Sequence, residues 1–171
     1  MANLEFIKSE SISTATTSFN IEDCFNQGYD VYYLAFQSFN ATSGTTIKLR
    51  FLDSSNNAIT SSEYDWAYLN LTSASTFVDT KAINQNIINF GTTSGNQISN
   101  MNVSAYVYNA DNSSSYTYLM SQGANGNTLE GRKQISVLTQ DSLIKGIQIT
   151  AGANMEIGTL SIYGIKQWVV A

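Results

Sequence analysis

Histidine and proline are missing from the 171-residue sequence, and Cys24 is its single cysteine. The lack of histidine excludes Ser-His-Asp triads, Cys-His pairs and most zinc or iron sites. One cysteine cannot form an intramolecular disulfide, and small secreted domains usually have several, so we expect the chain to fold in a reducing cytoplasm. The residues around Cys24 are acidic, whereas a nucleophilic thiol needs a nearby base or cation. We therefore interpret Cys24 as a small, semi-buried structural residue.

Charged residues are also scarce, at 12% of the chain against about 25% in ordinary globular domains. The net charge is −5 and the eight Lys and Arg residues are scattered. This pattern excludes the basic footprint that nucleic acids and anionic membranes require. We also expect no signal peptide and no membrane helix. A surface covered by Ser, Thr, Asn and Gln is typical of a protein in an assembly or outside a cell. The alternative is that an uncharged polar surface occurs in a protein with neither property.

Alternation of apolar and polar residues is the strongest signal that is present, and it is clearest in residues 101–122. The spacing predicts a β-hairpin, because successive side chains leave opposite faces of a strand. Its turn is the Asn/Asp/Ser-rich segment 109–114. We expect one face of the first arm to hold Met101, Val103, Ala105 and Val107, with Tyr106 and Tyr108 opposite; in the second arm Tyr116, Tyr118 and Met120 lie opposite Thr117 and Leu119.

Further short segments of the same kind bring the expected total to roughly eight to ten strands, with less than about a tenth of the chain in helix. Residues 29–39 are apolar on both faces and predict a central strand covered on each side. Residues 45–53 predict a strand with Ile47, Leu49 and Phe51 inward and Leu52 outward. Residues 78–89 are the weakest region. The predicted fold is all-β: an antiparallel, jelly-roll-like β-sandwich in a single domain, 1–171, with a short N-terminal arm (about 1–18) and an apolar C-terminal tail (167–171).

Aromatic residues offer two candidate platforms for stacking on sugars. One consists of Tyr64, Trp66 and Tyr68 on one parity of a strand. The other lies in the hairpin and consists of Tyr106, Tyr108, Tyr116 and Tyr118. The alternative is that these cross-strand aromatic residues fill the core of the sandwich.

Oxygen-bearing side chains give no convincing catalytic or metal site. Glu63 and Asp65 share a strand parity, but we interpret them as solvated carboxylates rather than a glycosidase pair. The turn at Asn109, Asp111 and Asn112 fits an Asx-type turn better than a calcium loop. We therefore predict no catalytic residue, no metal and no cofactor.

Both ends of the chain carry apolar residues where chains usually fray. We predict that they make assembly contacts, through Leu4, Phe6 and Ile7 at one end and Trp168, Val169 and Val170 at the other.

Three stretches, in order along the chain, carry a resemblance to a known family. They are residues 29–32 (YDVY), the turn 109–115 leading into Tyr116, and residues 157–166 (IGTLSIYGIK), where a Gly-Thr pair precedes a Tyr-Gly pair. This pattern resembles the small β-sandwich virion structural proteins of tailed, often marine, bacteriophages. The tail 167–171 departs from it, since the family often stops soon after the Tyr-Gly pair.

The resemblance implies a structural component of the virion with no catalytic residue to carry over. Such modules are capsid decoration (cement) proteins that stabilise the head through protein-protein contacts, or tail-fibre and receptor-binding modules that recognise a host-surface glycan. Because the chain shows neither a coiled coil nor repeats for a fibre shaft, we favour the decoration protein. Its expected partners are the major capsid protein or tail proteins and further copies of itself, with a trimer as the expected form.

Overall fold

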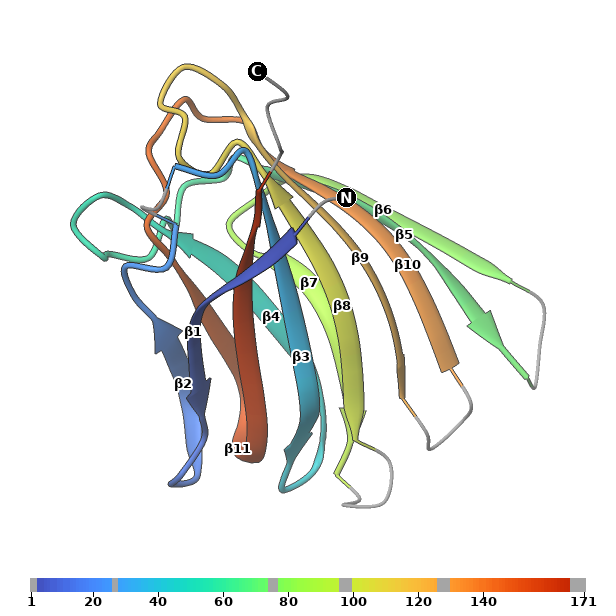
Figure 1. Ribbon diagram of the computed structural model, residues 1–171. Helices are drawn as coiled ribbons and strands as arrows, with labels where there is room; N and C mark the ends of the chain where they lie inside the picture. Colours follow the sequence, from blue (N-terminus) through green and yellow to red (C-terminus); the bar gives the residue numbers. More distant parts are fainter. Residues whose placement is uncertain (1–2, 26–27, 74–76, 96–99, 126–129, 167–171) are drawn as a thin grey trace.

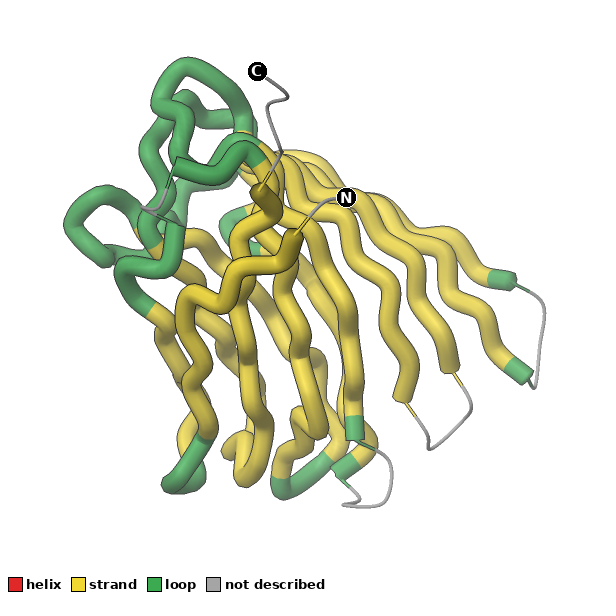
Figure 2. Tube along the Cα trace, in the orientation of Figure 1, coloured by secondary structure: helices red, strands yellow, loops and turns green. Residues whose placement is uncertain are grey.

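The computed structural model describes residues 3–25, 28–73, 77–95, 100–125 and 130–166. This part of the chain contains eleven β-strands joined by turns and loops, and no helix (Figure 2). Accordingly, none of it forms a helix of the length and apolarity that a membrane crossing needs. The strands are β1 (Asn3–Ser11), β2 (Thr16–Ile21), β3 (Val31–Ala41), β4 (Gly44–Leu52), β5 (Tyr64–Thr72), β6 (Val78–Gln85), β7 (Ile88–Ser94), β8 (Met101–Tyr108), β9 (Thr117–Asn125), β10 (Glu130–Leu138) and β11 (Gly146–Lys166).

All strand pairs are antiparallel, in the order β6-β5-β10-β9-β8-β3-β11-β4-β7, with β1 and β2 paired to β11. The all-β antiparallel fold predicted from the sequence is therefore confirmed. The weak region 78–89 holds β6 and the start of β7.

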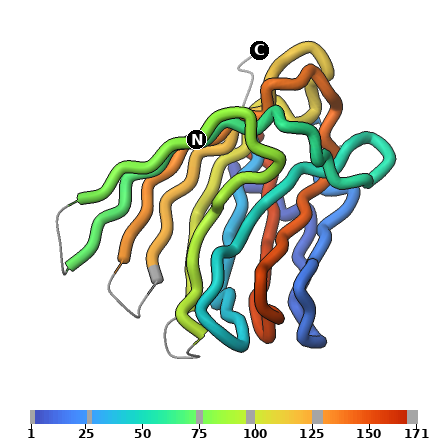
Figure 3. The backbone as a smooth tube through the Cα atoms, turned by 180° about the vertical axis from the view of Figure 1, so that it is seen from behind, coloured from blue at the N-terminus to red at the C-terminus, as the bar shows by residue number. Residues whose placement is uncertain are grey.

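Strand β11 belongs to two layers. Its first part pairs with β4 and β2, and its second part pairs with β3 and β1. We call β6-β5-β10-β9-β8-β3-β11-β1 the front layer and β7-β4-β11-β2 the back layer (Figures 1 and 3). The two layers are thus one continuous sheet, folded at β11 and nearly closed into a barrel, rather than two separate sheets.

The core lies between the layers and is built by strict alternation. Strand β8 buries its odd-numbered residues and exposes most of its even-numbered ones, and the described part of β9 follows the same rule. The hairpin prediction is confirmed in this respect. Aromatic pairs fill the centre, with 4.6 Å between the ring centroids of Phe36 and Phe90 and 4.8 Å between those of Phe25 and Tyr32.

Three burial predictions need correction. Strand β3 is covered on one face only: Tyr32, Leu34 and Phe36 are buried, whereas the side chains between them are partly exposed because nothing in the described structure covers the front layer from outside. Leu52 was expected to point outward, but it is buried because the following loop folds back and Ala58 pairs with it. Cys24 is fully rather than partly buried.

The expected N-terminal arm is part of the sheet in its described portion. Strand β1 pairs with the second part of β11, where the Ser9 and Ser161 hydroxyls lie 2.9 Å apart, and β2 pairs with the first part. The first two strands therefore extend both layers.

The Tyr-Gly pair near the end of β11 has a packing explanation. Tyr163 points away from the core, and Gly164 points inward beneath the ring of Tyr29. A Cβ atom at position 164 would lie 2.5 Å from that ring, so only glycine lets Tyr29 cover this part of the layer.

Candidate functional site

Side chains that point away from the core form the outer face of the front layer, which nothing in the described structure covers. The strand registers align eight of them in one line across the layer, which we call the apolar row. In order from β1 to β6 it consists of Phe6, Tyr163, Tyr33, Tyr106, Met120, Ile135, Ala67 and Lys81.

The aromatic half of the apolar row is a chain of ring contacts. The centroid distances are 5.7 Å from Phe6 to Tyr163, 6.0 Å from Tyr163 to Tyr33 and 5.3 Å from Tyr33 to Tyr106. Neighbouring ring planes are inclined by 69°, 40° and 50°. The rings pack against one another and do not form the coplanar platform that stacking on a flat ligand would use.

The apolar row is bordered by a polar row and a mixed row. The polar row lies one pleat away, and the Ser104 hydroxyl within it is 3.1 Å from the Tyr33 hydroxyl. Shallow depressions separate the side chains of β8, β9, β10, β5 and β6. The polar row contains Ser9, Ser161, Ala35, Ser104, Gln122, Lys133, Leu69 and Asp79, and the mixed row contains Val31, Tyr108, Tyr118, Val137 and Asp65.

The structure separates the two aromatic platforms expected from the sequence. Tyr106 lies in the apolar row and Tyr108 beside it on the outer face, whereas Tyr64, Trp66 and Tyr68 point to the inner side of β5. Tyr64 is fully buried, accepts a hydrogen bond from the Phe51 amide and donates one to a backbone carbonyl, each at 3.1 Å. Burial raises the pKa of Tyr64 well above its ordinary value. It is a core residue with no ring face open to a ligand.

Trp66 and Tyr68 belong to a cluster centred on Arg132, which no sequence motif indicated. The Trp66 and Tyr68 rings stack at 5.6 Å with an interplanar angle of 7°, and the Arg132 guanidinium lies 3.8 Å from the centre of the Tyr68 ring. Arg132 Nε donates to Asn70 Oδ1 at 3.0 Å, and Nη1 donates to Asn89 Oδ1 at 3.3 Å.

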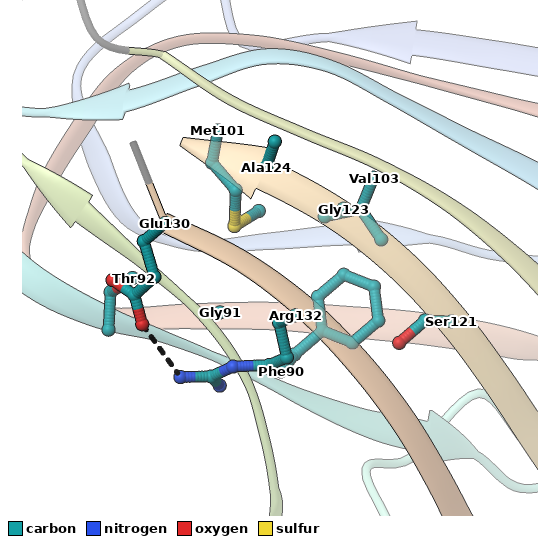
Figure 4. A pocket seen from close by; sticks show the side chains of 10 residues that line it. All are labelled: Phe90, Gly91, Thr92, Met101, Val103, Ser121, Gly123, Ala124, Glu130 and Arg132. Carbon is teal, nitrogen blue, oxygen red and sulfur yellow. Dashed lines mark hydrogen bonds and ion pairs between the residues drawn. The ribbon is translucent and has the colours of Figure 1, made fainter. Parts of the chain in front are cut away.

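This arginine joins the two layers at the side away from β11. It also lies 4.0 Å from Glu130, which accepts a hydrogen bond from Thr92 Oγ1 on β7 (Figure 4). Burial lowers the pKa of Arg132, while Tyr68 and Glu130 favour its charged form. The pocket beside it has room for about one water molecule. We conclude that the cluster holds β7 against β10 and β5.

The remaining polar candidates are engaged in local structure. Asp65 accepts the Asn84 amide at 2.8 Å, and Ser61 donates to Glu63 at 2.9 Å. In the turn of the hairpin, Asn112 Oδ1 accepts the Ser114 amide at 2.9 Å, which is the predicted Asx turn. No group of three or more His, Cys, Asp or Glu residues gathers anywhere in the described ranges.

The predicted contact residues at the chain ends differ in how exposed they are to solvent. Leu4 and Phe6 are 53% and 60% exposed, and Phe6 begins the apolar row. Ile7 is half-buried and packs against the core. Trp168, Val169 and Val170 lie outside the described residues.

Comparison with known proteins gives no match. No protein-family model fits the chain, and no curated protein is significantly similar to it in sequence. The outer face therefore has to be interpreted from its own chemistry.

Proposed function

We propose that this protein is a bacteriophage virion structural protein, most simply a capsid decoration (cement) protein that acts through protein-protein contacts. The observation that carries the proposal is the apolar character of the outer face. Nine of the thirteen large hydrophobic residues that are exposed among the described residues lie there: Leu4, Phe6, Leu69, Leu71, Ile83, Tyr106, Tyr118, Met120 and Ile135.

The size of this surface favours a macromolecular partner. A large side chain has roughly 200 Å² of surface, so nine of them at about half exposure present on the order of 800 Å². The largest apolar patch on a typical monomer is roughly 300–600 Å². An exposed apolar surface of this extent supports the proposal that a partner covers the outer face in the working assembly.

The chemistry of the outer face favours a protein over a sugar. Tyrosine, methionine and phenylalanine are enriched at the centres of protein interfaces, where charges are depleted. The apolar row has one charge, Lys81, and it lies at the outermost strand. The inclined rings of Phe6, Tyr163 and Tyr33 support the same conclusion, since sugar stacking needs open ring faces.

The phage assignment is supported by the resemblance in residues 29–32, 109–115 and 157–166. The apolar outer face supports the decoration role, because a cement protein acts through protein-protein contacts. Mass spectrometry of purified phage particles tests the proposal directly: we expect peptides of this protein in stoichiometric amounts in the particle. Its absence from intact virions, with the protein present in the infected cell, refutes the proposal.

A second candidate is a receptor-binding module for a host-surface glycan. One observation favours it: Tyr106 borders a depression on the outer face that also contains Ser104, Gln122 and Lys133, a set of hydrogen-bonding groups beside an aromatic ring. Binding on a glycan array that is lost in Tyr106→Ala would favour this candidate. Trp66→Ala is the control, because Trp66 lies on the inner side of the layer and should leave glycan binding intact.

A further inference from the structure

We propose that the outer face pairs with the outer face of a second copy of this chain, about a two-fold axis that runs parallel to the strands between β8 and β9. The inference rests on the proposed function only in assigning the outer face to protein contacts. It specifies the partner and the geometry of the contact.

The apolar row has two unlike halves that suit this geometry. Strands β1, β11, β3 and β8 contribute Phe6, Tyr163, Tyr33 and Tyr106, whereas β9, β10, β5 and β6 contribute Met120, Ile135, Ala67 and Lys81. A two-fold rotation about an axis between β8 and β9 reverses the row and places the aromatic half of each copy on the aliphatic half of the other.

The facing pairs are complementary in size and chemistry. Tyr106 meets Met120 of the second copy, a favourable sulfur-aromatic combination. Tyr163 meets Ala67 of the second copy, so that a large side chain faces a small one. Phe6 meets Lys81 of the second copy, which allows a cation-π contact. Each of these pairs occurs twice in the dimer, as an isologous interface requires.

The charges of the outer face also allow a second copy to approach. Four charged residues lie on it, namely Asp65, Asp79, Lys81 and Lys133, so its charges sum to zero in a chain whose net charge is −5. The same rotation places Ser104 of the polar row opposite Gln122 of the second copy. Two copies therefore meet without like-charge repulsion at the contact.

The area is that of a stable dimer. Standard protein interfaces bury about 800 Å² on each partner, which is the order of the apolar area that the outer face exposes. Two sheet faces that pack against each other lie about 10 Å apart, so the side chains of the two outer faces would interdigitate.

Sedimentation equilibrium of the purified protein, in the absence of any particle, tests the inference. We expect a monomer-dimer equilibrium that Met120→Lys weakens by on the order of a hundredfold, because it brings two unpaired like charges together near the axis. The matched control is Ser18→Lys on β2, which adds the same charge to the back layer and should leave the dimer intact. Circular dichroism checks that both variants fold.

Disulfide trapping tests the register. Mixing Tyr106→Cys with Met120→Cys should give a heterodimeric cross-link under mild oxidation, whereas Tyr106→Cys with Leu4→Cys should not; the native Cys24 is buried and does not compete. A monomer at every concentration, a trimer, or a dimer that tolerates Met120→Lys would overturn the inference. Because these measurements use no phage, they are independent of whether the protein is found in virions.

Discussion

Arg132→Met should separate the two layers at the side away from β11. The Arg132 side chain is only 10% exposed. Methionine keeps an apolar stem of similar length but lacks the guanidinium. Hydrogen bonds from a charged group contribute about 1.5–3 kcal/mol each, and a partly buried cation-π contact about 0.5–2 kcal/mol. The desolvation cost of the charge, which the folded protein no longer bears in the variant, offsets part of this. We expect a net loss of about 3 kcal/mol in the free energy of unfolding.

Equilibrium unfolding in urea, at protein concentrations where the chain is monomeric, measures this loss. Arg132→Lys should fall between wild type and Arg132→Met, because lysine keeps the charge but has neither the planar fork nor the stacking surface. The matched control is Lys133→Met on the same strand, whose side chain points to the outer face; it should change stability by less than about 0.5 kcal/mol.

A double-mutant cycle with Tyr68→Leu isolates the stacking contact, where the guanidinium lies 3.8 Å from the ring. We expect a coupling energy of about 0.5–2 kcal/mol. A loss below about 1 kcal/mol for Arg132→Met, together with no coupling to Tyr68, would show that Arg132 does not hold β7 against β10 and β5 and would refute the reasoning.

Three other predictions concern the core. Burial raises the pKa of Cys24 to about 12 from its ordinary value of 9.0. Between about pH 9 and pH 12 the thiol is therefore protonated in the folded state and ionised in the unfolded state, so the free energy of unfolding should fall as the pH rises. Urea titrations across that range should show a shallower decline for Cys24→Ala than for wild type. Gly164→Ala should destabilise the protein by about 1–3 kcal/mol in thermal melts, because the added Cβ displaces the Tyr29 ring. In the double variant with Tyr29→Ala most of that penalty should disappear, since the ring is no longer there to be displaced. Phe36→Ala should cost about 3–5 kcal/mol in the same assay, since the ring is buried against Phe90; a loss under about 1 kcal/mol would show that this contact is not part of the core.

Local patterns in the sequence predicted local structure well. The alternation from Met101 to Tyr108 identified a strand and its buried face, and the same reasoning placed Ile47, Leu49 and Phe51 inward. The prediction that β3 is covered on both faces was wrong because its sequence is apolar on both faces. A sequence of that kind does not indicate whether protein covers the second face or leaves it open to solvent. Its tyrosines can lie half-exposed at little cost, since the hydroxyl group remains hydrated.

Long-range pairing explains what the sequence could not indicate. The apolar row exists only because eight strands align in one register. Phe6 and Tyr163, for example, lie near opposite ends of the sequence but are paired in the sheet. Arg132 likewise acquires its partners from β5 and β7 after those strands have been placed. Two signals in the sequence indicated that the outer face of the sheet carries large apolar residues. One was Tyr106, Tyr118 and Met120 at the solvent-facing positions of the hairpin, and the other was the apolar character of both faces of residues 29–39.

The double membership of β11 has a consequence for biosynthesis. Strands β1, β2, β3 and β4 all pair with it. In a nascent chain that has emerged only as far as β10, the paired strands β6-β5-β10-β9-β8-β3 and the β4-β7 pair therefore lack the strand that joins them, and β1 and β2 lack a partner. The two layers can join into one continuous sheet only after the polypeptide has been synthesised through β11. Such non-local pairing folds slowly and leaves strand edges open in the meantime.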